Sequence, residues 1–143
     1  MSYLSNFEHS FLAHTLELVR TYRGEFDATL MMNCLLGLLI VPKEKFLQQI
    51  PEDSLEDLAK WGITPDSIKQ AGQPTSNNPR PDTLRGLVTN LRHAVAHFSI
   101  KPIPATAAVH SFEYKNDSGL HAVISVAEMR VFVDKLSAYL ASK

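Results

Sequence analysis

The spacing of apolar residues along the chain predicts four main helices. In three of them apolar residues recur every three or four positions, which is the period of a helix with one buried face. The remaining one is apolar nearly all round, so we expect it to be the central, most buried helix. The predicted helices run from a cap at Ser5 or Asn6 to about Tyr22, from about Glu25 to Ile40, from a cap at Asp82 or Thr83 to about His97 or Phe98, and from after Ser125 to about Ala141.

The buried face of each amphipathic helix follows from the same spacing. In the first helix we expect Phe7, Phe11, His14 or Thr15, Leu18 and Tyr22 to face the core. In the last helix we expect Val126, Met129, Phe132 or Val133, Leu136 and Leu140 to do so.

The connecting segments predict minor elements. "KEKFLQQI", "SLEDLAKW" with Ser54 as its cap, and "PDSIKQA" are expected to form short helices. "GQPTSNNPRP", residues 72–81, has the composition of an irregular and mobile loop. "KPIPAT" is not helical, and "HSFEYK", the turn "NDSG" and "LHAVISV" alternate as a β-hairpin in which Gly119 closes the turn. The predicted fold is mainly α: one domain over residues 1–143, an up-and-down bundle of four main helices plus short helices, with one small β-hairpin before the last helix.

Composition and charge narrow the classes of function. The formal net charge of the 143 residues is −1, so nothing draws the whole surface to nucleic acid or to anionic membranes. Any RNA or phosphate binding must come from a local site. Cys34 is the single cysteine, so no disulfide can form within the chain. The most apolar segment, residues 30–41, is too short to cross a bilayer. The first residues lack the pattern of a signal peptide, so we expect a cytoplasmic protein with no membrane partner.

The third main helix contains the chemically distinctive stretch "LRHAVAHFSI". At 100° per residue, one side of this helix is broadly apolar and faces the core. Arg85 and Arg92 lie beside that apolar side, whereas Asn90, His93 and His97 lie opposite it. The end of the helix therefore carries an arginine at the border of the apolar side and two histidines on the opposite side.

Three interpretations of this stretch remain open. Arg92 could hold a phosphate diester through its forked guanidinium while His97 moves a proton, which together would cleave RNA without a metal ion. His93 and His97, four residues apart, could instead bind zinc, but the glutamate of the H-E-x-x-H motif and an obvious third ligand are absent. The third interpretation is a solvated helix face that happens to contain histidines.

Helix geometry limits the first interpretation. Residues five positions apart point about 140° away from each other. Arg92 and His97 can therefore meet on one ligand in only three ways: through the reach of arginine, through a helix end that unwinds near His97, or across a dimer interface.

Further polar residues could support such a site. Asn33 lies inside the apolar second helix, where its amide is either satisfied by a neighbouring carbonyl or hydrogen-bonded into the motif site to fix His97. Asn90 lies on the same side of the motif helix as His93. Arg85, like Arg80, could add positive charge beside Arg92.

The segment "RHAVAHF", after a long loop in a small chain, resembles the HEPN (higher eukaryotes and prokaryotes nucleotide-binding) domains. Their signature is an arginine, four to six residues and a histidine, often with a polar residue after the arginine, and Arg92, His93 and His97 match these positions. "FDATLMMNCLLGLLIVPKE" and the ending "HSFEYKND…LHAVISVAEMRVFVDKLSAYL" also resemble small stand-alone HEPN proteins of bacteria and mobile elements.

The resemblance implies a homodimer whose two motif helices share a cleft, and a metal-independent endoribonuclease with no cofactor. Arg92 would stabilise the scissile phosphate, His97 would act as general base or acid, and His93 would assist. It also implies a role in toxin–antitoxin pairs, plasmid maintenance or defence, with a protein antitoxin as a partner besides RNA. Ser99 replaces a tyrosine that toxin members often carry. The alternative is a non-catalytic helical dimerisation or interaction module.

Overall fold

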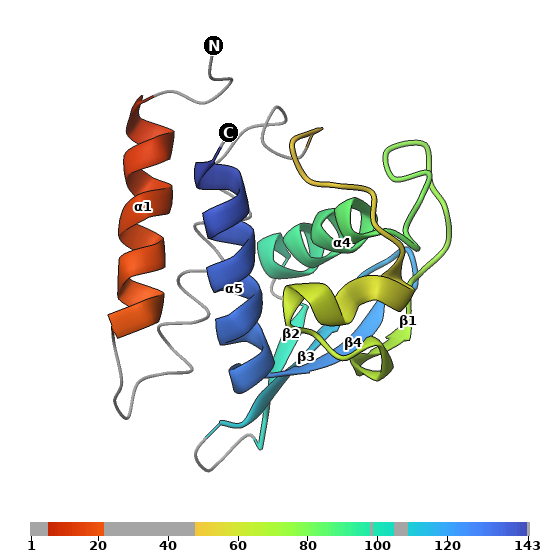
Figure 1. The fold of residues 1–143 in the computed structure, drawn as a ribbon. Coiled ribbons are helices and arrows are strands. Elements are labelled where there is room, and N and C mark those ends of the chain that lie inside the picture. Colours follow the sequence, from red (N-terminus) through yellow and green to blue (C-terminus); the bar gives the residue numbers. More distant parts are fainter. Residues whose placement is uncertain (1–5, 22–47, 98, 105–108, 143) are drawn as a thin grey trace.

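The computed structural model describes residues 6–21, 48–97, 99–104 and 109–142. Figure 1 shows two helices side by side at one end of the molecule, and a sheet with further helices above it at the other end. The elements are α1 (Asn6–Thr21), the short 3₁₀ helices η1 (Leu55–Trp61) and η2 (Pro65–Ser67), β1 (Ile68–Gln70), α4 (Leu84–Ala96), β2 (Ile100–Ile103), β3 (Ser111–Lys115), β4 (His121–Ser125) and α5 (Val126–Ala141).

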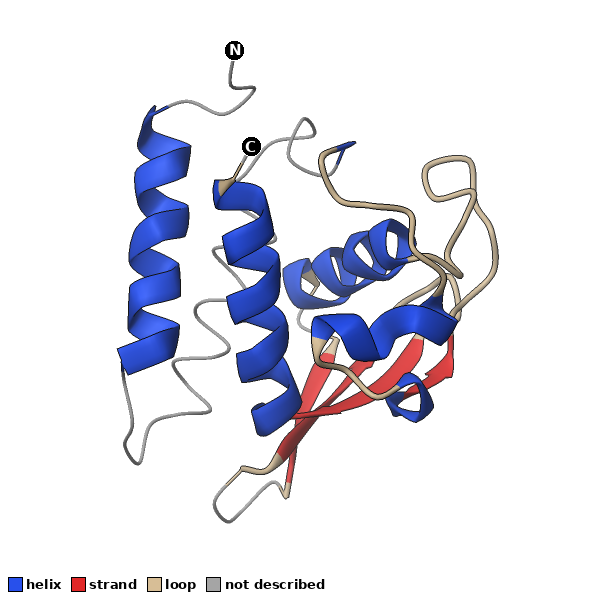
Figure 2. Cartoon of the chain, in the orientation of Figure 1, coloured by secondary structure: helices blue, strands red, loops and turns tan. Residues whose placement is uncertain are grey.

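The four strands form one antiparallel sheet in the order β1-β4-β3-β2. One face of the sheet is in the core, where Tyr114, Ala122 and Ile124 are fully buried, while Lys101 and Lys115 are exposed on the other. The helices cover the buried face, as Figure 2 shows with the strands in red. The fold is therefore α+β, and the predicted mainly α bundle with one small hairpin is wrong.

The hairpin that alternation predicts is present as β3 and β4, with Phe112 opposite Ile124 and with Gly119 at a φ of 99° in the turn. The two outer strands are what the sequence did not indicate. β2 contains Pro102, which is tolerated because β2 lies at an edge of the sheet and needs no N–H there. β1 has only three residues, too few for alternation to be visible, and follows directly on η2. "PDSIKQA" thus begins as the expected short helix, the 3₁₀ helix η2 with Pro65 at its first position, but continues as a strand from Ile68.

The predicted starts of the helices are confirmed where the structure describes them. Thr83 caps α4, since its side chain accepts a hydrogen bond from the Gly86 N–H, and Ser54 caps η1. Ser125 and Glu128 form a capping box at the start of α5. The helix predicted from residue 25 to residue 40 lies outside the described residues.

The buried side of α1 differs from the predicted stripe. Leu18 is 50% exposed and His14 is exposed, whereas Val19 is buried. α1 packs along α5, where Arg20 forms two hydrogen bonds with the carboxylate of Asp134, at 3.0 and 3.1 Å. The contact with α5 turns Val19 inward. Helical spacing alone predicted that the neighbouring residue, Leu18, would face the core instead.

The core joins α4, α5 and the inner face of the sheet. In α5 the predicted stripe is confirmed, because its members from Met129 to Leu140 are at most 2% exposed. The largest fully buried side chains are Tyr114, Phe132, Ile50, Leu58, Ile63 and Leu84.

Candidate functional site

Helix α4 has one face in the core, as its sequence predicts. Every apolar residue of that face within the described part of the chain is buried. They are Leu84, Leu87, Val88, Leu91, Ala94 and Val95, each at most 1% exposed. Of the opposite side, the exposed part is the end that carries His93 and His97.

The two histidines of the motif come together where α4 ends. The helix ends at Ala96, and His97 is its C-cap residue, with a backbone N–H that donates to the carbonyl of His93 at 3.1 Å. The imidazole rings of His93 and His97 lie with their centroids 4.5 Å apart at 52°. Both side chains are exposed, so both rings are accessible to a ligand.

Arg92 lies on a different side of the helix. Its side chain is half-buried, and it forms no hydrogen bond or ion pair with the residues that the structure describes. A helical step of 100° per residue separates Arg92 from His97 by about 140° around the axis. One copy of the chain thus brings His93 and His97 together but does not bring Arg92 to them.

Asn90 is the centre of a buried hydrogen-bond network. It is 3% exposed, and its amide Nδ2 donates to the carbonyl of Ala71 at 3.0 Å. Its Oδ1 accepts from the amides of Asn116 and Asn78, at 2.8 and 3.1 Å, and lies 3.2 Å from the hydroxyl of Ser118. The network joins α4 to the loop of residues 72–81 and to the β3–β4 turn.

The loop lies directly on the first turn of α4. A Cβ atom at Gly86 would lie 2.1 Å from the carbonyl oxygen of Arg80 and 2.7 Å from Cα of Pro81, so only glycine admits this approach. Asn78, 8% exposed, donates to the Gly86 carbonyl at 3.1 Å. The mobility that we expect for residues 72–81 stays a prediction, but these contacts define where the loop lies.

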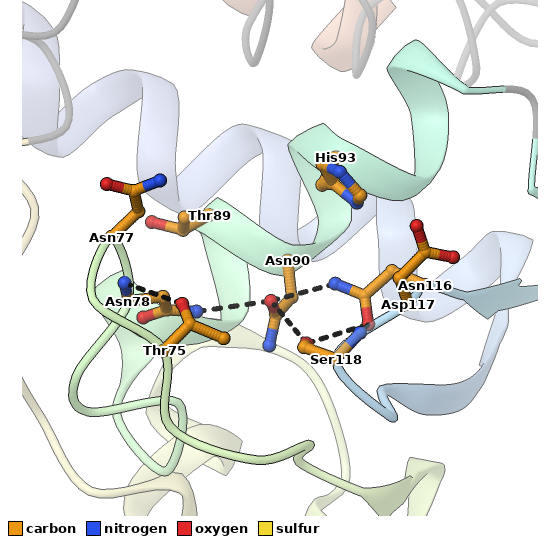
Figure 3. A pocket seen from close by; sticks show the side chains of 9 residues that line it. All are labelled: Thr75, Asn77, Asn78, Thr89, Asn90, His93, Asn116, Asp117 and Ser118. Carbon is orange, nitrogen blue, oxygen red and sulfur yellow. Dashed lines mark hydrogen bonds between the residues drawn. The ribbon is translucent and has the colours of Figure 1, made fainter.

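A cavity of about 340 Å³, lined by residues with polar side chains, opens beside this network. Figure 3 shows Asn90 at its centre, loop residues on one side, residues of the β3–β4 turn on the other, and His93 from α4 between them. His93 thus belongs both to the motif and to the lining of the cavity. Its lining is Thr75, Asn77, Asn78, Thr89, Asn90, His93, Asn116, Asp117 and Ser118.

Of the two remaining predicted residues, Arg85 is bound elsewhere. Its guanidinium donates to the carbonyls of Ile50 and Gln48, at 2.8 and 3.1 Å, and pairs with Glu52 at 2.6 Å. Arg85 therefore ties the segment before η1 to α4. Asn33 lies outside the described residues.

Sequence reasoning missed the three side chains that hydrogen-bond to Oδ1 of Asn90, namely Asn78, Asn116 and Ser118. They belong to "SNNP" and "NDSG", whose composition is that of ordinary turns. The only available signal was the presence of two asparagine-containing turns on either side of a helix that carries Asn90.

Two features of the described residues bear on other classes of protein. No group of three or more His, Cys, Asp or Glu side chains in them is placed to hold a metal ion. None of the helices in the described ranges is both long and apolar enough to cross a membrane.

The fold and the site together define a class of protein. It is a small α+β domain with an arginine and two histidines at the end of a partly buried helix. The sequence profile of the HEPN pEK499 p136 family matches residues 1–143. The chain therefore belongs to this HEPN family, as the resemblance of "RHAVAHF" predicts. Comparison with curated proteins gave no match. Comparison with solved structures gave none either.

Proposed function

We propose that this HEPN protein binds RNA and cleaves it without a metal ion, at a cleft formed by two α4 helices of a homodimer. The observation that carries the proposal is the state of the motif side chains. The side chains of Arg92, His93 and His97 form no hydrogen bond or ion pair with the described residues, whereas the amide of Asn90 on the same helix both donates and accepts buried hydrogen bonds. Unengaged cationic and titratable groups at a surface are available to a substrate.

The chemistry that these groups supply is transfer of the phosphodiester to the ribose 2′-oxygen. His97 accepts the proton of the 2′-hydroxyl, whose oxygen then attacks phosphorus. The bond from phosphorus to the 5′-oxygen breaks, and the 5′-oxygen takes a proton from a histidine, which leaves a 2′,3′-cyclic phosphate and a 5′-hydroxyl. Arg92 neutralises the charge on the pentacovalent phosphate. The substrate supplies the nucleophile, so no metal-bound water is required.

A homodimer solves the geometric problem of the motif. Because Arg92 and His97 point about 140° apart on one helix, one chain alone holds them poorly on one phosphate. Two α4 helices related by a two-fold axis would present the arginine of one copy near the histidines of the other. The exposed ring pair of His93 and His97, at the very end of α4, is placed to take part in such a cleft.

The test is cleavage of mixed cellular RNA by the purified protein in the presence of EDTA. Arg92→Ala and His97→Ala should each lower the rate at least about 100-fold, the usual contribution of a general acid–base group or a charge-stabilising group. Arg92→Lys should restore only part of the rate, because lysine keeps the charge but loses the fork. His110→Ala, an exposed histidine outside the site, is the matched control and should cleave like the unaltered protein.

Sedimentation at several concentrations should show a dimer. A protein that neither cleaves nor binds RNA, with or without metal ions, would overturn the proposal. A His97→Ala variant that loses its dimer or a protein partner, in a protein with no effect on RNA, would identify a non-catalytic interaction module instead.

A further inference from the structure

The cavity beside His93 is lined by residues of a different chemical kind from the arginine and histidines of the motif. Most of its lining residues carry an amide or a hydroxyl group, although carbon atoms make up most of the surface that they expose, and its charged or titratable members are Asp117 and His93. Arg92 does not line it. A carboxylate repels phosphate, and one carboxylate with one imidazole is too small a set to hold a metal ion. The lining therefore suits a neutral, planar ligand with apolar faces and polar edges.

From this lining we infer that the cavity binds a single RNA base next to the scissile phosphate, and that Asp117 selects guanine. The inference rests on the proposed function, since the base belongs to the RNA that the motif would cleave. A volume of about 340 Å³ is at the lower end of small-molecule pockets, which span roughly 300–1,000 Å³, so it admits one base.

Guanine follows from the donors and acceptors that remain unused. Asp117 is exposed at the rim, in the β3–β4 turn, and its carboxylate forms no hydrogen bond or ion pair with the described residues. An ionised carboxylate offers two acceptors side by side and no donor. Among the four RNA bases, guanine alone presents two adjacent donors on its pairing edge, N1–H and the exocyclic amino group. The match is bidentate, as in other strong carboxylate pairs.

Other groups of the cavity complete the base site. The exposed amide of Asn77, on the loop side in Figure 3, has no hydrogen bond with the described residues and can donate to acceptors on the far edge of the base. The imidazole of His93 offers a flat surface of the kind on which unstacked RNA bases pack. His93 also contacts the His97 ring, so a base held there lies next to the reacting groups.

The network beneath fixes the shape of the cavity. Asn90 and Asn116 use their amide groups on each other and on Asn78, Ala71 and Leu120. These side chains cannot reorient toward a ligand without losing buried hydrogen bonds, so they act as a rigid floor. Selectivity is left to the unengaged groups at the rim.

The test uses neutral nucleosides, which carry no phosphate, titrated into the protein of residues 1–143 and followed by NMR or calorimetry. Guanosine should bind, and inosine, which lacks only the exocyclic amino group, should bind about tenfold more weakly. Asp117→Asn should abolish the difference between guanosine and inosine, because the amide replaces one acceptor by a donor. Asp57→Asn, a matched change at an exposed aspartate of η1, should leave the difference intact.

Equal binding of guanosine and inosine, or an unchanged preference in Asp117→Asn, would overturn the inference. Cleavage of oligonucleotides with a single guanosine separates this inference from the proposed function. RNA cleavage without guanosine binding or base preference refutes the base site and leaves the nuclease standing. Guanosine binding in a protein that cleaves no RNA refutes the nuclease and leaves the base site standing.

Discussion

Asn90 and His93 are one turn apart on the same side of α4, yet their surroundings are opposite. Asn90 is 3% exposed and hydrogen-bonded to the loop of residues 72–81 and to the β3–β4 turn. His93 is exposed and contacts the ring of His97. The loop and the turn cover the first of these residues and stop short of the second. A polar side chain on α4 is thus either part of the architecture or available to a ligand, and the covering segments decide which.

The largest expected effect on stability comes from removing the centre of the network. Asn90→Leu leaves the amides of Asn78 and Asn116 without their buried acceptor and the Ala71 carbonyl without its donor, which should cost about 3 kcal/mol of unfolding free energy. Urea denaturation measures it. His97→Ala, measured in the same way, should change stability by less than about 0.5 kcal/mol, as surface substitutions do. Equal losses of unfolding free energy in the two variants would contradict the contrast between a structural Asn90 and an unengaged histidine pair.

A smaller effect should follow from lifting the loop off α4. Gly86→Ala places a methyl group 2.1 Å from the Arg80 carbonyl, so the loop backbone has to move, at a cost of about 2 kcal/mol. The displaced loop would also carry Asn77 and Asn78 away from the cavity. Thermal unfolding measures the cost, and chemical shifts of Asn77 and His93 report the cavity. Unchanged stability would mean that the loop does not press on α4 in solution.

Glu128 is a charged side chain that, like Asn90, is held by several hydrogen bonds. Its replacement should have the smallest effect on stability of the three network and loop changes considered. Partial burial alone would raise the pKa of Glu128, but hydrogen bonds from the backbone of Ser125 and Thr64 and from the hydroxyl of Ser67 outweigh it and hold the pKa below its ordinary value. Glu128→Ala should cost about 1–2 kcal/mol at pH 7, through loss of the capping box and these bonds.

The pH dependence has a definite sign. A carboxyl group whose pKa is lowered by folding stabilises the fold above its unfolded pKa, near 4.5, and loses this contribution as pH falls further. The stability difference between the unaltered protein and Glu128→Ala should therefore be full at pH 7 and narrow below about pH 4.5. A difference that stays constant down to pH 3 would contradict the role given to these hydrogen bonds.

Local signals in the sequence predicted much of the fold. The caps Thr83 and Ser125, the apolar faces of α4 and α5, and the turn at Gly119 are all set by residues a few positions apart, and each is confirmed. The sheet escaped prediction because β1 is too short to show alternation and β2 contains Pro102. The fold class was wrong for this reason, although the central hairpin was found.

The site was harder to predict than the fold. Asn90 pairs with residues 12 and 26 positions away, and no local pattern encodes such contacts between two turns and a helix. Arg92, His93 and His97 came from the motif, and their catalytic roles stay predictions, as do the homodimer and a protein antitoxin. The positions of the two histidines at the end of α4 agree with the expectation of a helix end near His97.

The edges of the sheet have a consequence for assembly. At one edge β1 has three residues and an irregular register, and at the other β2 contains Pro102, which has no N–H to offer. Short, irregular or proline-containing edges resist the addition of another strand. Two copies of this chain are therefore poorly suited to join through these described edges into a continuous sheet, which disfavours strand-mediated aggregation there. For the homodimer proposed above, this favours contact through other surfaces, such as the end of α4 that carries the motif.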